Sequence, residues 1–144
     1  MTRKMILVGT GGFGQQWCEK FLPPNIADGT VEVVAAVDID DAALLNAKRH
    51  LGLRDDQLYT DIRQAFGEQR ADFCSVVVPP EKHEMVVGLA LEHGLDILCE
   101  KPIADSLAGA VRIAERVKRA GRKLAVTMSH RFDQAKTTLR EEIR

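Results

Sequence analysis

The stretch that decides the fold is Met5-Ile-Leu-Val-Gly9-Thr-Gly11-Gly12-Phe-Gly14-Gln15. Apolar residues lead into a glycine cluster with the spacing G-x-G-x-x-G at Gly9, Gly11 and Gly14. Such an apolar run at the start of a βαβ pattern predicts a parallel strand that is buried on both faces. In this turn the first glycine permits a tight bend, and the second lets the backbone approach a diphosphate. The third lets the following helix pack closely against the strand. The stretch therefore predicts a dinucleotide-binding turn at a helix N-terminus.

The composition is that of one globular domain. The chain has 144 residues, and 20 Lys and Arg against 21 Asp and Glu give a net charge of −1. This balance argues against a nucleic-acid-binding face. No apolar run is long enough for a membrane span, and we expect no signal peptide. Cys18, Cys74 and Cys99 and four scattered histidines lack metal-ligand spacing, so we expect no metal site and reduced core thiols in a cytoplasmic protein.

The rest of the chain alternates between apolar strands and amphipathic helices. Further strands are predicted at 31–37, 58–59, 73–78, 95–99 and 124–127. The first helix is expected to end near Leu22, because Pro23-Pro24-Asn25 and Asp28-Gly29 indicate a surface loop. Later helices are expected to bury Leu44, Leu45, Ala47, Ile62, Ala65, Phe66, Met85, Val86, Leu89, Ala90, Leu107, Val111, Ala114 and Val117. The pattern predicts an α/β fold, a doubly wound parallel sheet forming a single Rossmann domain over residues 1–128.

The expected helices carry start and stop signals. N-caps are expected at Asp40 or Asp41, at Thr60 or Asp61, and at Asp105 or Ser106. Gly94 and Gly121 are expected to end two helices. The stretch from Asp133 to Arg144 has a helical pattern with no capping glycine and no following strand. We therefore expect residues 129–144 to begin a connection to something that the chain does not contain.

Other classes of protein also use a glycine-rich motif, and the sequence can be tested for the further residues that each class requires. A phosphate-binding P-loop needs Lys and Ser or Thr after the last glycine, but Gln15 and Gln16 stand there. A short-chain dehydrogenase needs Tyr-x-x-x-Lys, and Tyr59 is followed at that spacing by Arg63. No G-x-S-x-G elbow is present. A methyltransferase that binds S-adenosylmethionine stays open, since it also uses glycines after the first strand and an acid after the second.

An acidic residue follows the second predicted strand. Asp38 lies 24 residues after Gly14, where a carboxylate accepts hydrogen bonds from the adenosine ribose. The next residues, Ile39, Asp40 and Asp41, include no cation for a 2′-phosphate. Like charges about 4 Å apart repel by up to about 4 kcal/mol at an effective dielectric near 20. We therefore predict NAD rather than NADP, with a simple helix-capping role for Asp38 as the alternative.

Three further segments carry a family resemblance. They are Val76-Val-Val-Pro79-Pro80-Glu-Lys-His83, Cys99-Glu100-Lys101-Pro102-Ile103 and Ser129-His130-Arg131-Phe132-Asp133. Together with the glycine turn, and in this order, they closely resemble the N-terminal half of the glucose-fructose oxidoreductase, inositol dehydrogenase and MocA-like family. The resemblance spans essentially the whole chain, and Glu-Lys-Pro is its most specific piece. In that family a second α/β domain follows, whose open sheet forms the substrate site and usually the oligomer interface.

The resemblance also implies roles for individual residues. Together with the glycine turn and the position of Asp38, it predicts cofactor binding by Gly9, Gly11, Gly12, Phe13, Gly14, Asp38, Val78, Pro79, His83, Glu100 and Lys101. It implies that Lys101 is the catalytic residue of this half, touching the substrate hydroxyl that loses its proton. It further implies a cis peptide before Pro102 and a place for Arg131 at the seam between the two domains.

The function expected from the resemblance is hydride transfer. The chain would be the NAD-binding domain of an oxidoreductase acting on the CH–OH group of a sugar, polyol or related compound, with a homo-oligomer as one arrangement of the full-length protein. The family's acid/base aspartate and histidine belong to the second domain, so we expect little or no turnover from this chain alone. The alternative is a non-catalytic module on the same fold that senses a dinucleotide and binds a protein partner.

Overall fold

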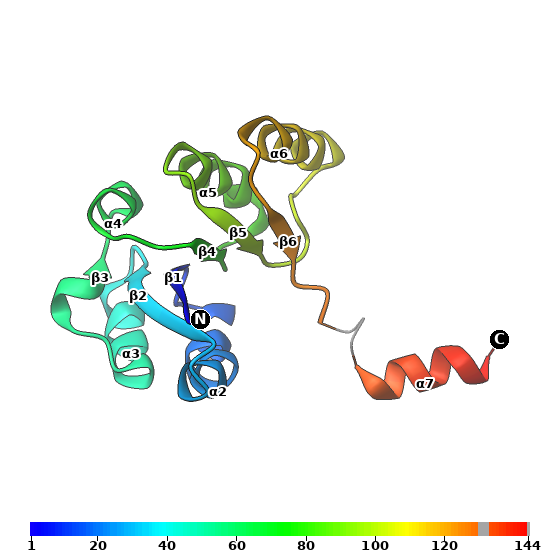
Figure 1. Cartoon of the computed structure of the whole chain (residues 1–144), viewed down its shortest axis with the longest axis horizontal. Coiled ribbons are helices and arrows are strands. Elements are labelled where there is room, and N and C mark those ends of the chain that lie inside the picture. The colour runs from blue at the N-terminus through cyan, green and yellow to red at the C-terminus, as the bar shows by residue number, and fades with distance from the viewer. Residues whose placement is uncertain (130–132, 144) are drawn as a thin grey trace.

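A single parallel sheet forms the centre of the molecule. The computed structural model describes residues 1–129 and 133–143. The strands, all paired in parallel, have the order β3-β2-β1-β4-β5-β6 (Figure 1). Their bounds are β1 Arg3–Val8, β2 Val31–Val37, β3 Leu58–Tyr59, β4 Phe73–Val76, β5 Asp96–Cys99 and β6 Leu124–Val126. The prediction of a doubly wound α/β fold is confirmed.

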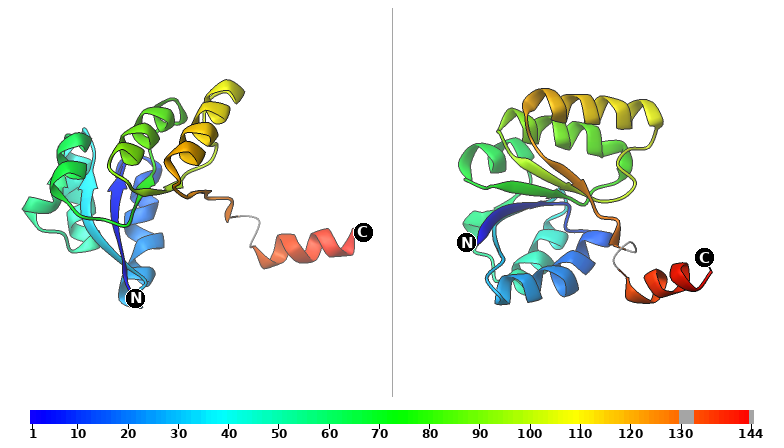
Figure 2. Two further views of the ribbon diagram at one scale, coloured as in Figure 1. Left: turned by 45° about the horizontal axis from the view of Figure 1, so that its top comes forward. Right: turned by 45° about the vertical axis from the view of Figure 1, so that its right-hand side comes forward.

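Helices cover both faces of the sheet, as Figure 2 shows from a second direction. On one face lie α1 (Phe13–Gln16), the π-helical turn η1 (Trp17–Phe21), α2 (Leu22–Ala27) and α3 (Asp41–Leu51). The other face carries α4 (Ile62–Glu68), α5 (Pro80–Glu92) and α6 (Leu107–Ala120). The 3₁₀ turn η2 (Asp55–Gln57) leads into β3. Each helix layer encloses its own apolar cluster against the central strands, as the continuous apolar strands of a parallel sheet require.

The first helix runs further than the sequence indicates. We predicted a loop at Pro23-Pro24-Asn25, and this is wrong, because these residues form the first turn of α2. The N–H of Leu22 donates to the carbonyl of Trp17, which is the wider hydrogen bond of a π turn. Pro23 and Pro24 have no N–H to donate, and they stand directly after this π turn, where the regular hydrogen-bond ladder is already interrupted. The turn at Asp28-Gly29 is present, with a positive φ of 74° at Gly29.

The helix starts follow the predicted caps. Asp40, Asp61 and Ser106 each accept a backbone N–H from the first turn of α3, α4 and α6. Gly94 and Gly121 take positive φ after α5 and α6. Short polar side chains satisfy N–H groups that a helix leaves unpaired, so these boundaries are set locally.

The buried faces of three helices differ from the prediction. Leu45, Met85, Leu107, Val111 and Ala114 were expected in the core and are exposed. In α6 the face toward the sheet is formed by Gly109, Ile113 and Val117 instead. A separation of two residues corresponds to a rotation of about 200° around the helix axis, so Val111 and Ile113 point in nearly opposite directions. Apolar residues occur on both sides of α6, and packing against α5 and the sheet selects one side.

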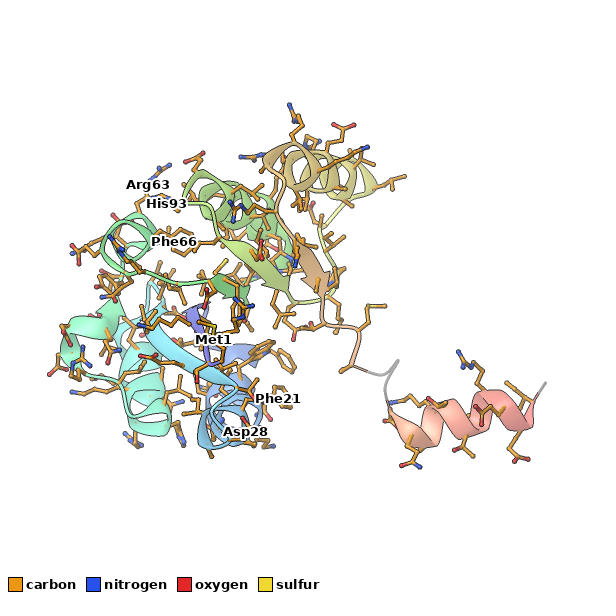
Figure 3. All side chains as sticks on the ribbon, in the orientation of Figure 1. Met1, Phe21, Asp28, Arg63, Phe66 and His93 are labelled. Atoms are coloured by element: carbon orange, nitrogen blue, oxygen red, sulfur yellow. The ribbon has the colours of Figure 1, made fainter. Side chains whose placement is uncertain are left out.

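The end of α5 is held against α4 by a ring contact. Phe66 of α4 and His93 after α5 lie side by side in Figure 3, with ring centroids 5.6 Å apart. Nδ1 of His93 also lies 3.0 Å from the carbonyl oxygen of Leu89. These contacts give His93 a structural place away from the carboxyl ends of the strands.

The chain leaves the sheet after β6. Helix α7 spans Gln134–Glu142, as its sequence pattern predicts, and it buries none of its residues (Figure 1). His130 and Arg131 lie outside the described residues, as does the expected role of Arg131 at a domain seam. Among residues 1–129 and 133–143, no helix combines the length and apolar character needed to cross a bilayer. A domain boundary near residue 128 stays a prediction.

Candidate functional site

The glycine turn connects β1 to α1 through close backbone contacts. Gly9 has a φ of +93°, and a Cβ there would overlap the carbonyl of Val77. A Cβ on Gly14 would overlap the carbonyl of Gly9, so α1 starts directly against the end of β1. Gly11 has ordinary contact room for a Cβ, and Gly12 has open space at a positive φ of 50°. The first and last glycines are therefore required by packing, as their positions in the motif predict.

A cavity of about 910 Å³ opens at the carboxyl ends of β1, β2, β4 and β5. Its lining includes nine of the residues expected from the sequence, namely Gly9, Gly11, Gly12, Phe13, Asp38, Val78, Pro79, Glu100 and Lys101. Further lining residues, which sequence reasoning did not assign to a site, are Val8, Val37, Ile39, Thr60, Ile62, Val77, Pro80, Lys82, Met85 and Val86. Open α/β sheets bind ligands at this edge, so the cavity is the candidate site.

Asp38 is hydrogen-bonded to the glycine turn. Its Oδ2 accepts hydrogen bonds from the backbone N–H of Thr10 at 2.7 Å and of Gly11 at 2.9 Å. The Thr10 hydroxyl adds a third bond to Oδ2, and Oδ1 accepts from the N–H of Asp40 at 3.1 Å. Partial burial raises the pKa of Asp38, but these donors together outweigh burial, so the net pKa lies below its usual value. The carboxylate is thus held charged at the β2 side of the turn.

The stabilising effect of Asp38 should depend on pH. A folded-state pKa below the unfolded value of 3.8 means that the contribution is complete above that value and is lost as pH falls through the folded pKa. We expect the difference in unfolding free energy between wild type and Asp38→Asn, measured in urea, to stay constant from pH 7 to about pH 5 and to shrink from there to about pH 2. Asp28, whose pKa is lowered by Thr30 at a fully exposed site, offers Asp28→Asn as a comparison with a smaller effect. A difference for Asp38→Asn that stays constant over this range would contradict the assignment.

His83 and Gly14 do not reach the cavity. His83 is 1% exposed, with Nε2 lying 2.8 Å from the carbonyl oxygen of Val78 and Nδ1 3.3 Å from that of Ile103. The imidazole therefore joins the segment after β4 to the segment after β5, both of which border the cavity. His83 therefore lies behind the residues that line the cavity, where its hydrogen bond positions the backbone of Val78. The sequence could not indicate this, because a histidine in the first turn of a helix looks the same whether it faces solvent or the core.

Glu100 and Lys101 follow β5 on the far side of the turn from Asp38. Oε1 of Glu100 accepts the indole N–H of Trp17 at 3.0 Å, and Oε2 accepts the backbone N–H of Lys101 at 3.1 Å. The Lys101 side chain is exposed at the cavity. The peptide before Pro102 is cis, as the resemblance implied. Sequence reasoning missed Trp17, although a buried indole N–H usually needs an acceptor.

The cysteines lie in the core. Cys18, Cys74 and Cys99 are buried and unpaired. Burial is the main cause that raises the pKa of Cys18 to about 11 and those of Cys74 and Cys99 to about 12. Thiols with such pKa values stay protonated near neutral pH and are poor nucleophiles. Within the described ranges, no group of three or more His, Cys, Asp or Glu residues is arranged to hold a metal ion.

Comparison with known proteins gives a consistent family. The chain is 56% identical over 140 residues to an uncharacterized protein of Sinorhizobium fredii, covering 97% of this chain and 39% of that protein. It is 32% identical over 144 residues to an inositol 2-dehydrogenase/D-chiro-inositol 3-dehydrogenase of Lacticaseibacillus casei, covering 99% of this chain and 40% of that protein. The chain thus spans about two fifths of the length of these relatives.

Solved structures of related dehydrogenases have the same fold. The scyllo-inositol dehydrogenase of Lactobacillus casei, solved with bound NAD(H) and scyllo-inositol, superimposes with a TM-score of 0.84 at 23% identity. The match covers 99% of this chain and 41% of that one. Residues 3–128 match the family model described as an oxidoreductase family with an NAD-binding Rossmann fold. The chain therefore belongs to this oxidoreductase family and contains its NAD-binding Rossmann domain.

Proposed function

We propose that this chain is the cofactor-binding part of an enzyme that transfers a hydride between NAD and the CH–OH carbon of a polyol or sugar. The observation that carries the proposal is one cavity with Asp38 at its β2 side, the glycine turn in the middle, and Glu100 and Lys101 at its β5 side. The names of the relatives support the substrate class, because they include inositol 2-dehydrogenases and a D-apiose dehydrogenase.

The residues present fit a dinucleotide. The turn at Gly9 to Gly12 would hold the diphosphate, because Gly9, Gly11 and Gly12 line the cavity and bring no side chain into it. Asp38 would hold the adenosine ribose on the β2 side, and the nicotinamide half would lie on the β5 side. When bound, the cofactor supplies the hydride acceptor or donor.

Lys101 is the residue we assign to catalysis. Its exposed ammonium lies at the β5 end of the cavity, where it can donate a hydrogen bond to a substrate hydroxyl. Such a cation stabilises negative charge that develops on the oxygen as the proton leaves. The substrate pocket and the remaining acid/base residues are assigned to a second domain following residue 128. We therefore expect the chain alone to bind the cofactor with little turnover.

The preference for NAD over NADP follows from the charges near Asp38. The cations that line the cavity among the described residues are Lys82 and Lys101, which follow β4 and β5. The β2 side carries Asp38, whose depressed pKa keeps it charged. A 2′-phosphate adds about 1.5 to 2 negative charges and would approach this carboxylate.

Calorimetric titration of the chain with NAD and NADP tests the proposal. We expect NAD to bind at least about tenfold more tightly, and Asp38→Ala to reduce both the affinity for NAD and the preference. Asp41→Ala is the matched control, since Asp41 carries a charge nearby without lining the cavity. Binding of S-adenosylmethionine without NAD would favour the methyltransferase reading and contradict the proposal.

A non-catalytic binding module is the second candidate. Leu139 and Ile143 are exposed on and just after α7, and Met128 is exposed after β6. Apolar side chains in such a position suit another domain, another copy of the chain or a protein partner. Sedimentation of the purified chain distinguishes self-association from a monomer. Hydride transfer restored by adding the second domain would favour the enzyme over the module.

A further inference from the structure

The contact between Trp17 and Glu100 joins the helical segment after the glycine turn to the segment after β5, where Glu100 lines the cavity. Trp17 lies in η1, just beyond the glycine turn, and is 7% exposed. Its indole N–H reaches Glu100, which follows β5 and lies 83 residues away in the sequence. On its other side the indole packs edge-on against Phe21, with ring centroids 6.2 Å apart. The indole is therefore fixed by packing while its one donor points at a residue that lines the cavity.

The donors that Glu100 receives are neutral. They are the indole N–H of Trp17 and the backbone N–H of Lys101. Over residues 1–129 and 133–143, no cation approaches the Glu100 carboxylate within ion-pair distance. Neutral donors fix the direction of a carboxylate without cancelling its charge, so Glu100 presents a negative charge to the β5 side of the cavity.

We propose that Trp17 is a positioning residue that holds the Glu100 carboxylate toward the nicotinamide half of the cavity and so favours binding of oxidised over reduced cofactor. The inference rests on the proposed function, because it requires NAD in this cavity. The nicotinamide ring is positively charged in the oxidised form and neutral in the reduced form. A fixed negative charge beside it therefore binds the oxidised form more tightly, and this advantage depends on the carboxylate being held in place.

The test compares affinities for NAD⁺ and NADH by calorimetry. Trp17→Phe keeps an aromatic ring against Phe21 and removes the N–H, while Glu100→Gln removes the charge and keeps an oxygen acceptor. We expect Glu100→Gln to lose roughly fivefold in the ratio of NAD⁺ to NADH affinity, the size of one partly screened charge. Trp17→Phe should lose part of this ratio, because the charge remains and only one of its two donors is removed. The affinity ratio of the double variant should fall no further than that of Glu100→Gln alone, because both changes act through one carboxylate.

Phe21→Leu is the control, since it disturbs the packing of Trp17 and leaves the N–H. We expect it to change the affinity ratio less than Trp17→Phe does, because the hydrogen bond from the indole to Glu100 can still form. Equal weakening of NAD⁺ and NADH by Trp17→Phe, or additive effects in the double variant, would show a purely structural role and overturn the inference. If Trp17→Phe fails to fold, Glu100→Gln decides, and an unchanged ratio there overturns it. Wild-type chain that binds neither form would instead contradict the proposed function.

Discussion

Gly14→Ala is expected to lower the free energy of unfolding by roughly 2–4 kcal/mol. The added Cβ would overlap the carbonyl carbon and oxygen of Gly9, which are backbone atoms and cannot rotate away. Relief requires the start of α1 to move away from the end of β1. Because that movement displaces the turn itself, we also expect NAD affinity to fall by roughly a hundredfold.

Urea unfolding and calorimetric titration measure the two effects of Gly14→Ala. The matched control is Gly67→Ala in α4, where a Cβ meets nothing within 4 Å. Alanine is a better helix former than glycine, so this variant should be more stable by about 0.5–1 kcal/mol and should bind NAD normally. If Gly14→Ala unfolded at the same urea concentration as wild type, the close contact between turn and helix would be refuted.

Ile113→Ala should destabilise the domain by about 3 kcal/mol. Ile113 is fully buried between α6 and the sheet, in the same apolar cluster as Val76 and Ile97. Truncating it removes apolar contacts and leaves a cavity, because the surrounding strands are held by their neighbours and close only partly. Ile113 does not line the cavity, so we expect NAD affinity in the folded variant to change little.

Val111→Ala is the control that shows whether the loss of stability is specific to the buried position or common to any truncation in α6. Val111 lies in the same helix two residues earlier and is 48% exposed. Its truncation should change the unfolding free energy by less than about 0.5 kcal/mol, as is usual for surface positions. Chemical denaturation of both variants provides the measurement. A larger loss for Val111→Ala than for Ile113→Ala would mean that α6 presents the face that its sequence suggested.

The candidate site was predictable in outline. Gly9, Asp38, Pro79 and Lys101 each follow a strand in the sequence, and parallel strands place such positions at one edge. The resemblance added Val78, Glu100 and the cis peptide at Pro102, which no local pattern indicates. Apolar lining residues such as Ile39 and Met85 were not assigned to a site, because exposed apolar residues near a strand end look like ordinary surface or core residues in a sequence.

The sequence by itself determined the order of strands and helices along the chain and the glycine turn, and it narrowed each of three helix caps to two neighbouring residues, of which Asp40, Asp61 and Ser106 form the caps. Each of these features depends on residues only a few positions apart. Only the tertiary structure decided which side of α6 is buried and where the ring of His83 points. It also decided that Trp17 meets Glu100. These features depend on the rotation of a helix and on contacts between distant segments, and both are selected when the whole sheet and its two helix layers pack together.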